Sequence, residues 1–333
     1  MKVVKTDKPE VSVVMCFYKE PLQWIRYAVE SIIGQTYTDF EVIIICDNPD
    51  HAEGIDYIRE VSKADHRISL VINPENLGPT RSFNIGIGRA RGKYIARMDS
   101  DDISLPERFE RQVNFLDSHP DVSVCATDAH IIDEKGRITR RNRYRKKYDP
   151  VWNLISNTIP HPSVMFRKGL LEVRNPIYNE DFIYSQDYEL WQFLLLKGHR
   201  LHTVEEPLIL YRKNSQQIST QKKQMQAELF RKAHKSFVTD WLLKRDIITK
   251  EDSKDLTRML EKSSGAFRNA EGDDRKGLAL VIYLLYFSLG TLDWKYRLRY
   301  IADRNFIPFR TRFILNYRLF FSRKKRRSRI GLV

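Results

Sequence analysis

Short apolar segments alternate with amphipathic segments over the first 130 residues of the chain. The apolar segments read VSVVMCFY, FEVIIICD, RISLVIN, KYIARMD and VSVCAT, and most of them are apolar on both faces of a strand. Apolar residues at helical spacing occupy residues 21–34, about 52–64 and 79–90, and a further helix is predicted at about 106–118. Because strands that alternate with helices form parallel sheets, we predict an α/β fold with a mainly parallel sheet flanked by helices.

The pattern changes in the second half of the chain. After residue 150, HPSVMFR and HTVEEPLILYR read as strands, and DYELWQFLLLKG reads as a helix that ends at Gly198. Beyond about residue 220 the strand signals stop, and helices with charged faces are predicted at 224–245, 250–264 and 276–290. We therefore expect an α/β domain over residues 1–220 and a helical C-terminal extension over residues 221–333.

Polar side chains follow each of the first four predicted strands. They are Tyr18 and Glu20, Asp47 and Asn48, Asn73 to Gly78, and Asp99 to Asp102. Ligands of parallel sheets bind beyond the carboxyl ends of the strands, where these side chains converge. An edge rich in carboxylates beside an aromatic side chain suits a divalent cation and a nucleotide.

The densest acidic cluster is Asp99, Asp101 and Asp102, directly after the fourth strand. Mg²⁺ and Mn²⁺ prefer carboxylate oxygens and often take their other ligands from phosphates and water. Of two aspartates separated by one residue, one can face a metal while the other faces a ribose. The alternative is a solvated helix N-terminus ahead of Pro106, and the spacing alone leaves both interpretations open.

The net charge of +14 raises the question of an anionic partner. Residues 295–333, the basic tail, hold 13 Lys and Arg and one acid, Asp303. The body of the chain, residues 1–294, therefore holds 44 basic and 42 acidic residues. Basic residues beside aromatic ones, as in RTRFILNYRLFFSRKKRRSR, suit an anionic membrane surface. A nearly neutral body without a recognition motif argues against nucleic acid, and a merely solubilising tail is the remaining alternative.

Other features bear on the compartment. Cys16 and Cys46 lie in apolar runs, which favours buried, reduced thiols in the cytosol, and the segment MKVVKTDKPE has no apolar signal region. Residues 277–292 carry no charge but number only 16, short of the roughly 20 that span a bilayer. We expect a buried or interfacial helix there.

Several blocks of the sequence resemble family 2 glycosyltransferases, whose catalytic domain has the GT-A fold. The blocks are VSVVMCFYKE, AVESIIGQTYTDFEVIIICDN and NLGPTRSFNIGIGRARGKYIARMDSDDISLPERFERQ, and the last of them contains the D-x-D-D motif at residues 99–102. The resemblance covers about residues 11–212. It implies transfer of a sugar from a nucleotide-diphosphate donor, with a UDP-sugar favoured, to an acceptor hydroxyl, assisted by Mn²⁺ or Mg²⁺.

The resemblance assigns nucleotide-binding roles to Tyr18 and Asp47. Tyr18 lies against the base, and Asp47 accepts a hydrogen bond from it; the family often has two aspartates here, and Cys46 stands in place of the first. The structural alternatives are a core tyrosine at a strand end and a turn aspartate.

The resemblance also assigns roles near the diphosphate. Asp99 contacts the ribose or phosphates, Asp101 holds the metal, and Asp102 is structural. Arg81 and Arg212 are the candidates for contacts with the diphosphate, although an exposed helical arginine such as Arg81 is more often only solvated.

A base must take the proton of the incoming hydroxyl, and Asp187 is the candidate at the start of a predicted helix, where the helix dipole favours its ionised form. The family has an acid–acid pair here, and Gln186 replaces its first member. His161 is placed on the acceptor side, although a structural histidine before Pro162 is an equal alternative. A simple helix cap is the alternative for Asp187.

We therefore predict an inverting, metal-dependent glycosyltransferase at the inner face of a bacterial membrane, acting on a lipid-linked glycan in surface-polysaccharide synthesis. A sugar-phosphate nucleotidyltransferase is one rival, but it needs a Gly-rich loop after the first strand, and CFYKEPLQW has no glycine. A non-catalytic nucleotide-sugar-binding protein is the other, but it would lack the metal aspartates or the base, and this chain has both.

Overall fold

The computed structural model of the chain describes residues 8–144, 157, 159–215, 217, 222–244, 246–251, 253, 259, 262–263 and 266. The chain divides into two compact units, Met1–His234 and Lys235–Val333. The predicted helix at 276–290, the apolar segment 277–292 and the basic tail lie outside the described residues. The predicted boundary at residue 221 stays a prediction.

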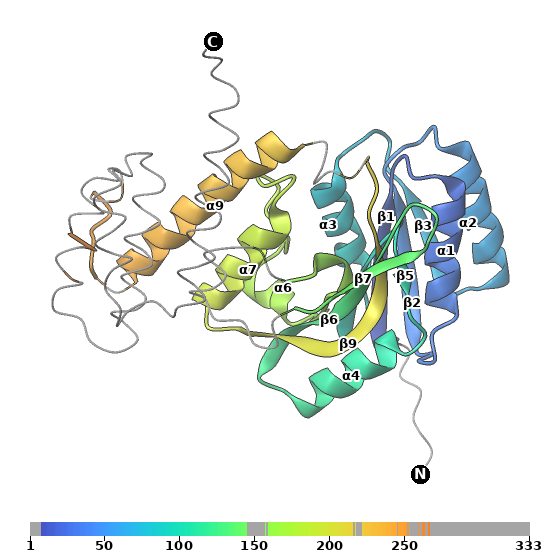
Figure 1. The fold of residues 1–333 in the computed structure, drawn as a ribbon, viewed down its shortest axis with the longest axis horizontal. Helices are drawn as coiled ribbons and strands as arrows, with labels where there is room; N and C mark the ends of the chain where they lie inside the picture. The colour runs from blue at the N-terminus through green and yellow to red at the C-terminus, as the bar shows by residue number, and fades with distance from the viewer. Residues whose placement is uncertain are drawn as a thin grey trace. The chain divides into compact units, whose positions relative to one another are not determined.

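The described strands form one mixed sheet with the order β3-β2-β1-β4-β8-β6-β9-β5, and β7 pairs with β6 at its side (Figure 1). The strands are β1 (Val11–Phe17), β2 (Phe40–Cys46), β3 (Ile68–Ile72), β4 (Tyr94–Asp99), β5 (Ile103–Ser104), β6 (Val122–Ile132), β7 (Ile138–Asn142), β8 (Met165–Arg167) and β9 (Arg200–Arg212). Strands β1, β2, β3 and β4 pair with one another in parallel, whereas β8 runs antiparallel to both β4 and β6. The predicted parallel sheet is thus confirmed for the first half of the chain.

Helices cover both faces of the sheet (Figure 1). The described helices of the chain are α1 (Leu22–Ile33), α2 (Ala52–Ala64), α3 (Pro79–Arg89), α4 (Arg108–Ser118), the 3₁₀-helix η1 (His161–Ser163), α6 (Leu170–Val173), α7 (Gln186–Leu196) and α9 (Lys223–Leu243). Apolar side chains of α1, α2 and α4 pack on one face, and those of α3, α6 and α7 pack on the other. Val13 and Val14 on β1 belong to opposite clusters, which explains why the early strands are apolar at consecutive positions.

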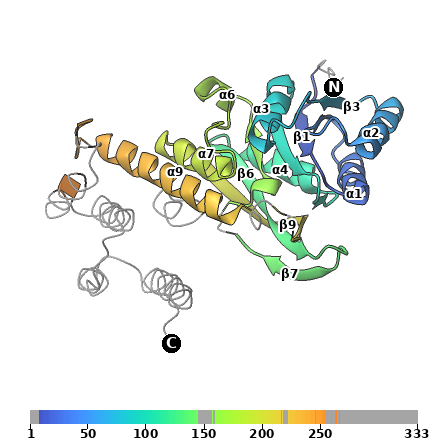
Figure 2. The ribbon, with the colours of Figure 1, turned by 90° about the horizontal axis from the view of Figure 1, so that it is seen from above.

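The second half of the sheet frames the end of β4. After Asp99 the chain turns through residues 100–102 into β5, which is only two residues long and pairs with β9. Strand β9 also runs parallel to β6, and the β6–β7 hairpin projects beside it (Figure 2). The acidic turn is therefore bordered by two distant parts of the sequence, β9 and the β6–β7 hairpin.

Arg108 anchors α4 beneath this turn. Its side chain is fully buried, its Nη2 donates to the carbonyl of Arg97 at 2.7 Å, and its Nε donates to Gln112 at 3.1 Å. Burial lowers the pKa of Arg108 to about 10. Because Gln112 in turn donates to the carbonyl of Ser163 at 2.8 Å, one polar chain joins α4, β4 and η1.

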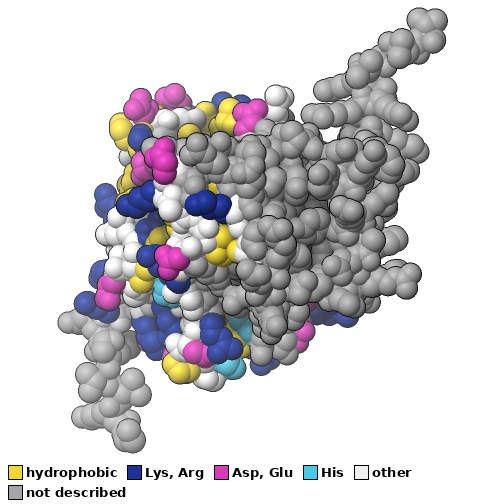
Figure 3. Space-filling view, turned by 90° about the vertical axis from the view of Figure 1, so that its left-hand side faces the viewer, with side chains coloured by type: hydrophobic (Ala, Val, Ile, Leu, Met, Phe, Trp, Pro, Cys, Tyr) yellow, Lys and Arg dark blue, Asp and Glu magenta, His cyan; other side chains and the backbone are white. Residues whose placement is uncertain are grey.

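The surface of the described residues mixes both signs of charge. On the face shown in Figure 3, Lys and Arg side chains lie interspersed with Asp and Glu side chains. This agrees with the nearly balanced charge of the body. Within the described part of the chain, the structure contains no helix with the length and apolarity needed to cross a membrane.

Helix α3 approaches β1 closely at Gly86, which gives a test of this packing. A Cβ at Gly86 would lie 2.4 Å from Cγ1 of the buried Val14, whereas a Cβ at Gly88, on the same helix, meets nothing within 4 Å. We expect Gly86→Ala to lower the free energy of unfolding by about 1–3 kcal/mol through overpacking. Gly88→Ala serves as the control and should raise it by up to about 1 kcal/mol through helix propensity. Denaturant titrations of both variants measure this; equal shifts for the two would contradict the packing.

Candidate active site

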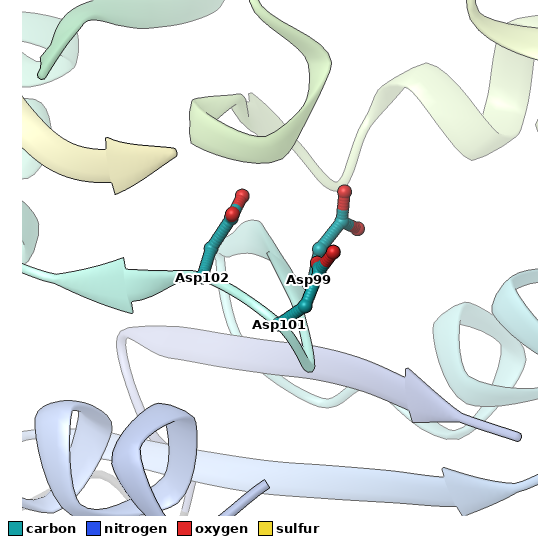
Figure 4. Close-up of side chains that lie close together, drawn as sticks. All are labelled: Asp99, Asp101 and Asp102. Carbon is teal, nitrogen blue, oxygen red and sulfur yellow. The ribbon is translucent and has the colours of Figure 1, made fainter. Parts of the chain in front are cut away.

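Asp99, Asp101 and Asp102 converge at the turn that follows β4. Each offers a carboxylate oxygen within 4.8 Å of the others. Figure 4 shows the side chains of Asp99 and Asp101 next to each other, with Asp102 on the side toward β5. Asp99 and Asp101 are partly exposed and Asp102 is fully buried, so the open side of the cluster is formed by the first two.

Crowding makes this turn electrostatically unfavourable for three negative charges. Burial and the neighbouring Asp99 raise the pKa of Asp101 to about 7. Burial, followed by Asp101 and Asp99, raises the pKa of Asp102 well above its usual range. One oxygen of Asp102, Oδ2, is buried and has no hydrogen-bond partner among the described residues. A hard divalent cation would relieve both the repulsion and the missing contact, so this set of oxygen donors fits Mg²⁺ or Mn²⁺.

Arg212 holds the turn in place from the end of β9. Its backbone N–H donates to Asp102 Oδ1 at 2.8 Å, and its Nε donates to the carbonyl of Asp101 at 2.7 Å. Its Nη1 donates to the carbonyls of Asp133 and Glu134 in the β6–β7 turn, each at 3.1 Å. The side chain is buried, and these contacts are made within the protein; the predicted contact of Arg212 with a diphosphate stays a prediction.

Three of the expected nucleotide-binding residues lie at neighbouring strand ends. In the sheet Phe17 pairs with Cys46 and Cys16 pairs with Asp99, which places Tyr18 and Asp47 directly beyond the adjoining ends of β1 and β2. Tyr18 is partly exposed. The parallel register thus brings Tyr18, Asp47 and Asp99 to one edge.

The carboxylate of Asp47 is largely occupied by the loop after β3. Its Oδ1 accepts from Asn73 Nδ2 at 2.7 Å and from the N–H of Leu77 at 2.9 Å. Its Oδ2 accepts from the N–H of Gly78 at 2.9 Å. Gly78 has a φ of +83°, a left-handed conformation that glycine adopts without strain. Asp47 therefore fixes the shape of the loop that leads into α3.

Arg81 lies on the exposed side of α3. Its Nε forms an ion pair with Glu180 Oε2 at 2.8 Å, and the two side chains are 58% and 39% exposed. The neighbouring Asn84 donates to the carbonyl of Tyr178 at 2.9 Å and accepts from its N–H at 3.1 Å. These contacts tie α3 to the loop before α7 and occupy both Arg81 and Glu180.

Asp187 lies in the first turn of α7 with its side chain 20% exposed. Asn157 Nδ2 donates to its Oδ2 at 2.5 Å, and His161 Nδ1 lies 4.0 Å from the same oxygen. Burial raises the pKa of Asp187, which is partly opposed by the N–H of Tyr188 and by Asn157. A carboxylate with a raised pKa, open to solvent at one side, is suited to accept a proton.

His161 is placed beside Asp187 and is almost fully buried. Its Nε2 lies 2.8 Å from the hydroxyl of Tyr178. Burial, followed by the nearby positive charge of Arg97, lowers the pKa of His161 well below its usual range, so the imidazole is neutral. The histidine that the sequence analysis assigns to the acceptor side is thus a direct neighbour of the candidate base.

The sequence analysis missed Arg97. This residue precedes Asp99 by two positions on β4 and shares its face of the strand, and its Nη2 lies 2.8 Å from Asp99 Oδ1. Its guanidinium lies 3.5 Å above the ring of Phe83. A single arginine inside the apolar run KYIARMD was the available signal, because a buried charge in a central strand needs a specific partner.

Comparison with known sequences identifies the family of the chain. Residues 12–174 match the model of the family described as glycosyl transferase family 2. An uncharacterised glycosyltransferase of Methanocaldococcus jannaschii is 36% identical over 63% of this chain and 73% of its own length. The amylovoran biosynthesis glycosyltransferase AmsE of Erwinia amylovora is 30% identical over 62% of this chain and 78% of its own length.

Solved structures agree on the fold. The structure of S. aureus TarS 1–349 in complex with UDP-GlcNAc superposes with a TM-score of 0.57 at 16% identity, over 84% of this chain and 81% of that one. The mannosyltransferase PcManGT from Pyrobaculum calidifontis, in complex with GDP-Man and Mn²⁺, gives 0.51 at 15% identity, over 94% of this chain and 81% of that one. The predicted GT-A fold is confirmed. From its family match and its relatives, the chain is a glycosyltransferase and belongs to glycosyl transferase family 2.

Proposed function

We propose that this glycosyltransferase moves a sugar from a nucleotide-diphosphate donor to an acceptor hydroxyl, with inversion at the anomeric carbon. One observation carries the proposal: Arg97 forms an ion pair with Asp99, and its positive charge is also near enough to Asp187 to oppose in part the burial that raises the pKa of that carboxyl group. The acidic turn and the candidate base therefore border the same site. Family membership favours this transferase activity over a nucleotidyltransferase or a non-catalytic binding protein.

On the donor side, Tyr18 stacks on the base, Asp47 shapes the loop beside it and accepts from the base, and Asp99 contacts the ribose or phosphates. Arg81 leaves its ion pair with Glu180 and binds the diphosphate. Arg212 acts on the diphosphate by holding the acidic turn in place. The complexes of TarS with UDP-GlcNAc and of PcManGT with GDP-Man support a nucleoside-diphosphate sugar, and we propose a UDP-sugar.

Asp101, with its neighbours in the turn, would hold Mn²⁺ or Mg²⁺. The ion supplies Lewis-acid stabilisation of the leaving nucleoside diphosphate. The Mn²⁺ in the PcManGT complex supports this choice of cofactor. Asp101 and Asp99 present their oxygens from the open side of the turn, where the diphosphate would lie.

Asp187 takes the proton of the acceptor hydroxyl on the other side of the site. A single displacement, in which the hydroxyl oxygen bonds to the anomeric carbon as the diphosphate departs, inverts that carbon. Asn157 and His161 flank the carboxylate of Asp187 and leave one side of it open to the acceptor.

The proposed acceptor is a lipid-linked glycan in bacterial surface-polysaccharide synthesis. The named role of AmsE in amylovoran biosynthesis supports this class of product. The basic tail of residues 295–333 supports attachment of the enzyme to the anionic inner face of the cell membrane from the cytoplasm.

The first test removes the metal ligand. We expect Asp101→Ala to lower the rate of nucleoside-diphosphate release from the preferred UDP-sugar by at least about 100-fold, because the leaving group loses its counter-charge. EDTA should have the same effect on the unaltered protein, and Mn²⁺ or Mg²⁺ should restore it. Asp56→Asn, which removes a carboxylate 72% exposed on α2, is the control and should keep full activity. Full activity in EDTA would contradict the proposed metal dependence.

The second test removes the base. We expect Asp187→Asn to lower kcat by about 10²- to 10⁴-fold, the usual contribution of a general base. Calorimetric affinity for UDP should stay unchanged, because Asp187 does not touch the nucleotide. Asp181→Asn, an exposed acid in the preceding loop, is the matched control. Loss of UDP binding in Asp187→Asn, or an unchanged kcat, would rule out this role.

A further inference from the structure

We propose that Arg97, Tyr178 and His161 form a buried polar chain that positions the base Asp187 relative to the donor-binding Asp99. This inference rests on the proposed roles of Asp187 and Asp99. The three side chains come from β4, from the loop between α6 and α7, and from η1, so the chain crosses the site from its donor side to its acceptor side. None of the three needs to touch the reacting atoms, and each is a positioning residue.

The donor end of the chain is Arg97. Its side chain is 8% exposed, against 25% for Asp99, with which it forms an ion pair of 2.8 Å. Its Nε and Nη1 have no hydrogen-bond partner among the described residues. A buried guanidinium with unpartnered N–H groups is unfavourable, so its presence in the core calls for a function beyond packing.

Tyr178 is the middle of the chain and is 1% exposed. Burial raises the pKa of Tyr178 to about 12, although Arg97 acts in the opposite direction. The hydroxyl is therefore protonated at neutral pH. Arg97 is near enough to this hydroxyl to act on it electrostatically, and a guanidinium offers only donors. We therefore infer that the hydroxyl proton points to Nε2 of His161, 2.8 Å away, rather than toward Arg97.

This direction of donation sets the tautomer of His161. A neutral imidazole whose Nε2 accepts a hydrogen bond carries its proton on Nδ1. Nδ1 lies 4.0 Å from Asp187 Oδ2, so the N–H group is a near neighbour of the carboxylate, just beyond hydrogen-bond distance. The edge of Trp191 also packs against the ring, with 5.8 Å between centroids, which fixes its plane.

The chain thus joins two partly exposed carboxylates through three buried side chains. Tightly packed groups do not deform gradually, so the spacing between Asp99 and Asp187 is set by the chain. A displacement of the base by about 1 Å is enough to cost about 100-fold in rate. Apolar side chains of the same volume would fill this space but would leave the tautomer of His161 and the orientation of Asp187 unspecified.

The test removes one oxygen atom from the middle of the chain. We expect Tyr178→Phe to lower kcat for UDP-sugar hydrolysis by about tenfold while KM for the donor and calorimetric UDP affinity stay unchanged. The acid limb of the kcat–pH profile should also move to higher pH. Without the fixed Nδ1–H, the carboxylate of Asp187 loses a stabilising dipole, and the pKa of Asp187 rises.

Tyr94→Phe is the matched control. Like Tyr178, Tyr94 is fully buried; it lies on β4, and its hydroxyl donates to Asp117 at 2.6 Å, at the other end of the strand from the acidic turn. Its loss should leave both kcat and the pH profile unchanged. An equal fall in kcat for the two variants would mean that the effect is only one of stability, and an unchanged kcat for Tyr178→Phe would also overturn the proposal.

A second pair of variants covers the case in which Tyr178→Phe does not fold. His161→Asn places an amide N–H near the position of Nδ1, whereas His161→Leu does not, so the first should retain at least about tenfold more activity. Equal rates would overturn the proposal. Failure of the proposed function has a different signature, because Asp187→Asn would then hydrolyse the donor as fast as the unaltered protein.

Discussion

The contact between Arg212 and the acidic turn is the interaction on which the geometry of the site depends. Strand β5 is too short to hold the turn by itself, and three crowded carboxylates would otherwise drive it apart. Arg212 supplies a backbone donor to Asp102 and a guanidinium shared among main-chain carbonyls of two loops. Arg212 is the last residue of the long strand β9, so its contacts hold the turn to the rigid sheet.

Three arginines around the proposed site already have fixed neighbours. Arg97 is committed to Asp99, Arg81 to Glu180, and Arg212 to carbonyl oxygens. Three carboxylates of the site, those of Asp99, Asp101 and Asp187, are partly exposed. Such a surface repels an anionic diphosphate unless a cation accompanies it, which is a physical reason to expect metal and donor to bind together.

The first half of the fold could be predicted from the sequence because its order is local. Apolar runs and amphipathic segments define β1 to β4 and their helices, and parallel pairing then brings Tyr18, Asp47 and Asp99 to one edge. In the second half, the segment HTVEEPLILYR is predicted as a strand and forms β9, but β5 and β7 are not predicted. Strand β5 is only two residues long and is defined by its pairing with the distant β9, and β7 is largely exposed with almost no apolar pattern. The same limit applies to single residues. Arg97 and Arg212 are buried because of contacts that form only in the folded sheet, whereas the residue type alone predicts an exposed arginine.

Because the carboxylate of Asp47 is occupied by the loop after β3, this loop should tolerate changes of side chain but not changes of length. Asp47 binds amide groups of the main chain at Leu77 and Gly78, and so responds to where the backbone runs rather than to which side chains the loop carries. Exposed positions such as Glu75 can therefore be exchanged freely over evolutionary time. An insertion or deletion between Asn73 and Gly78, in contrast, would move the amides out of register and abolish the loop in a single step.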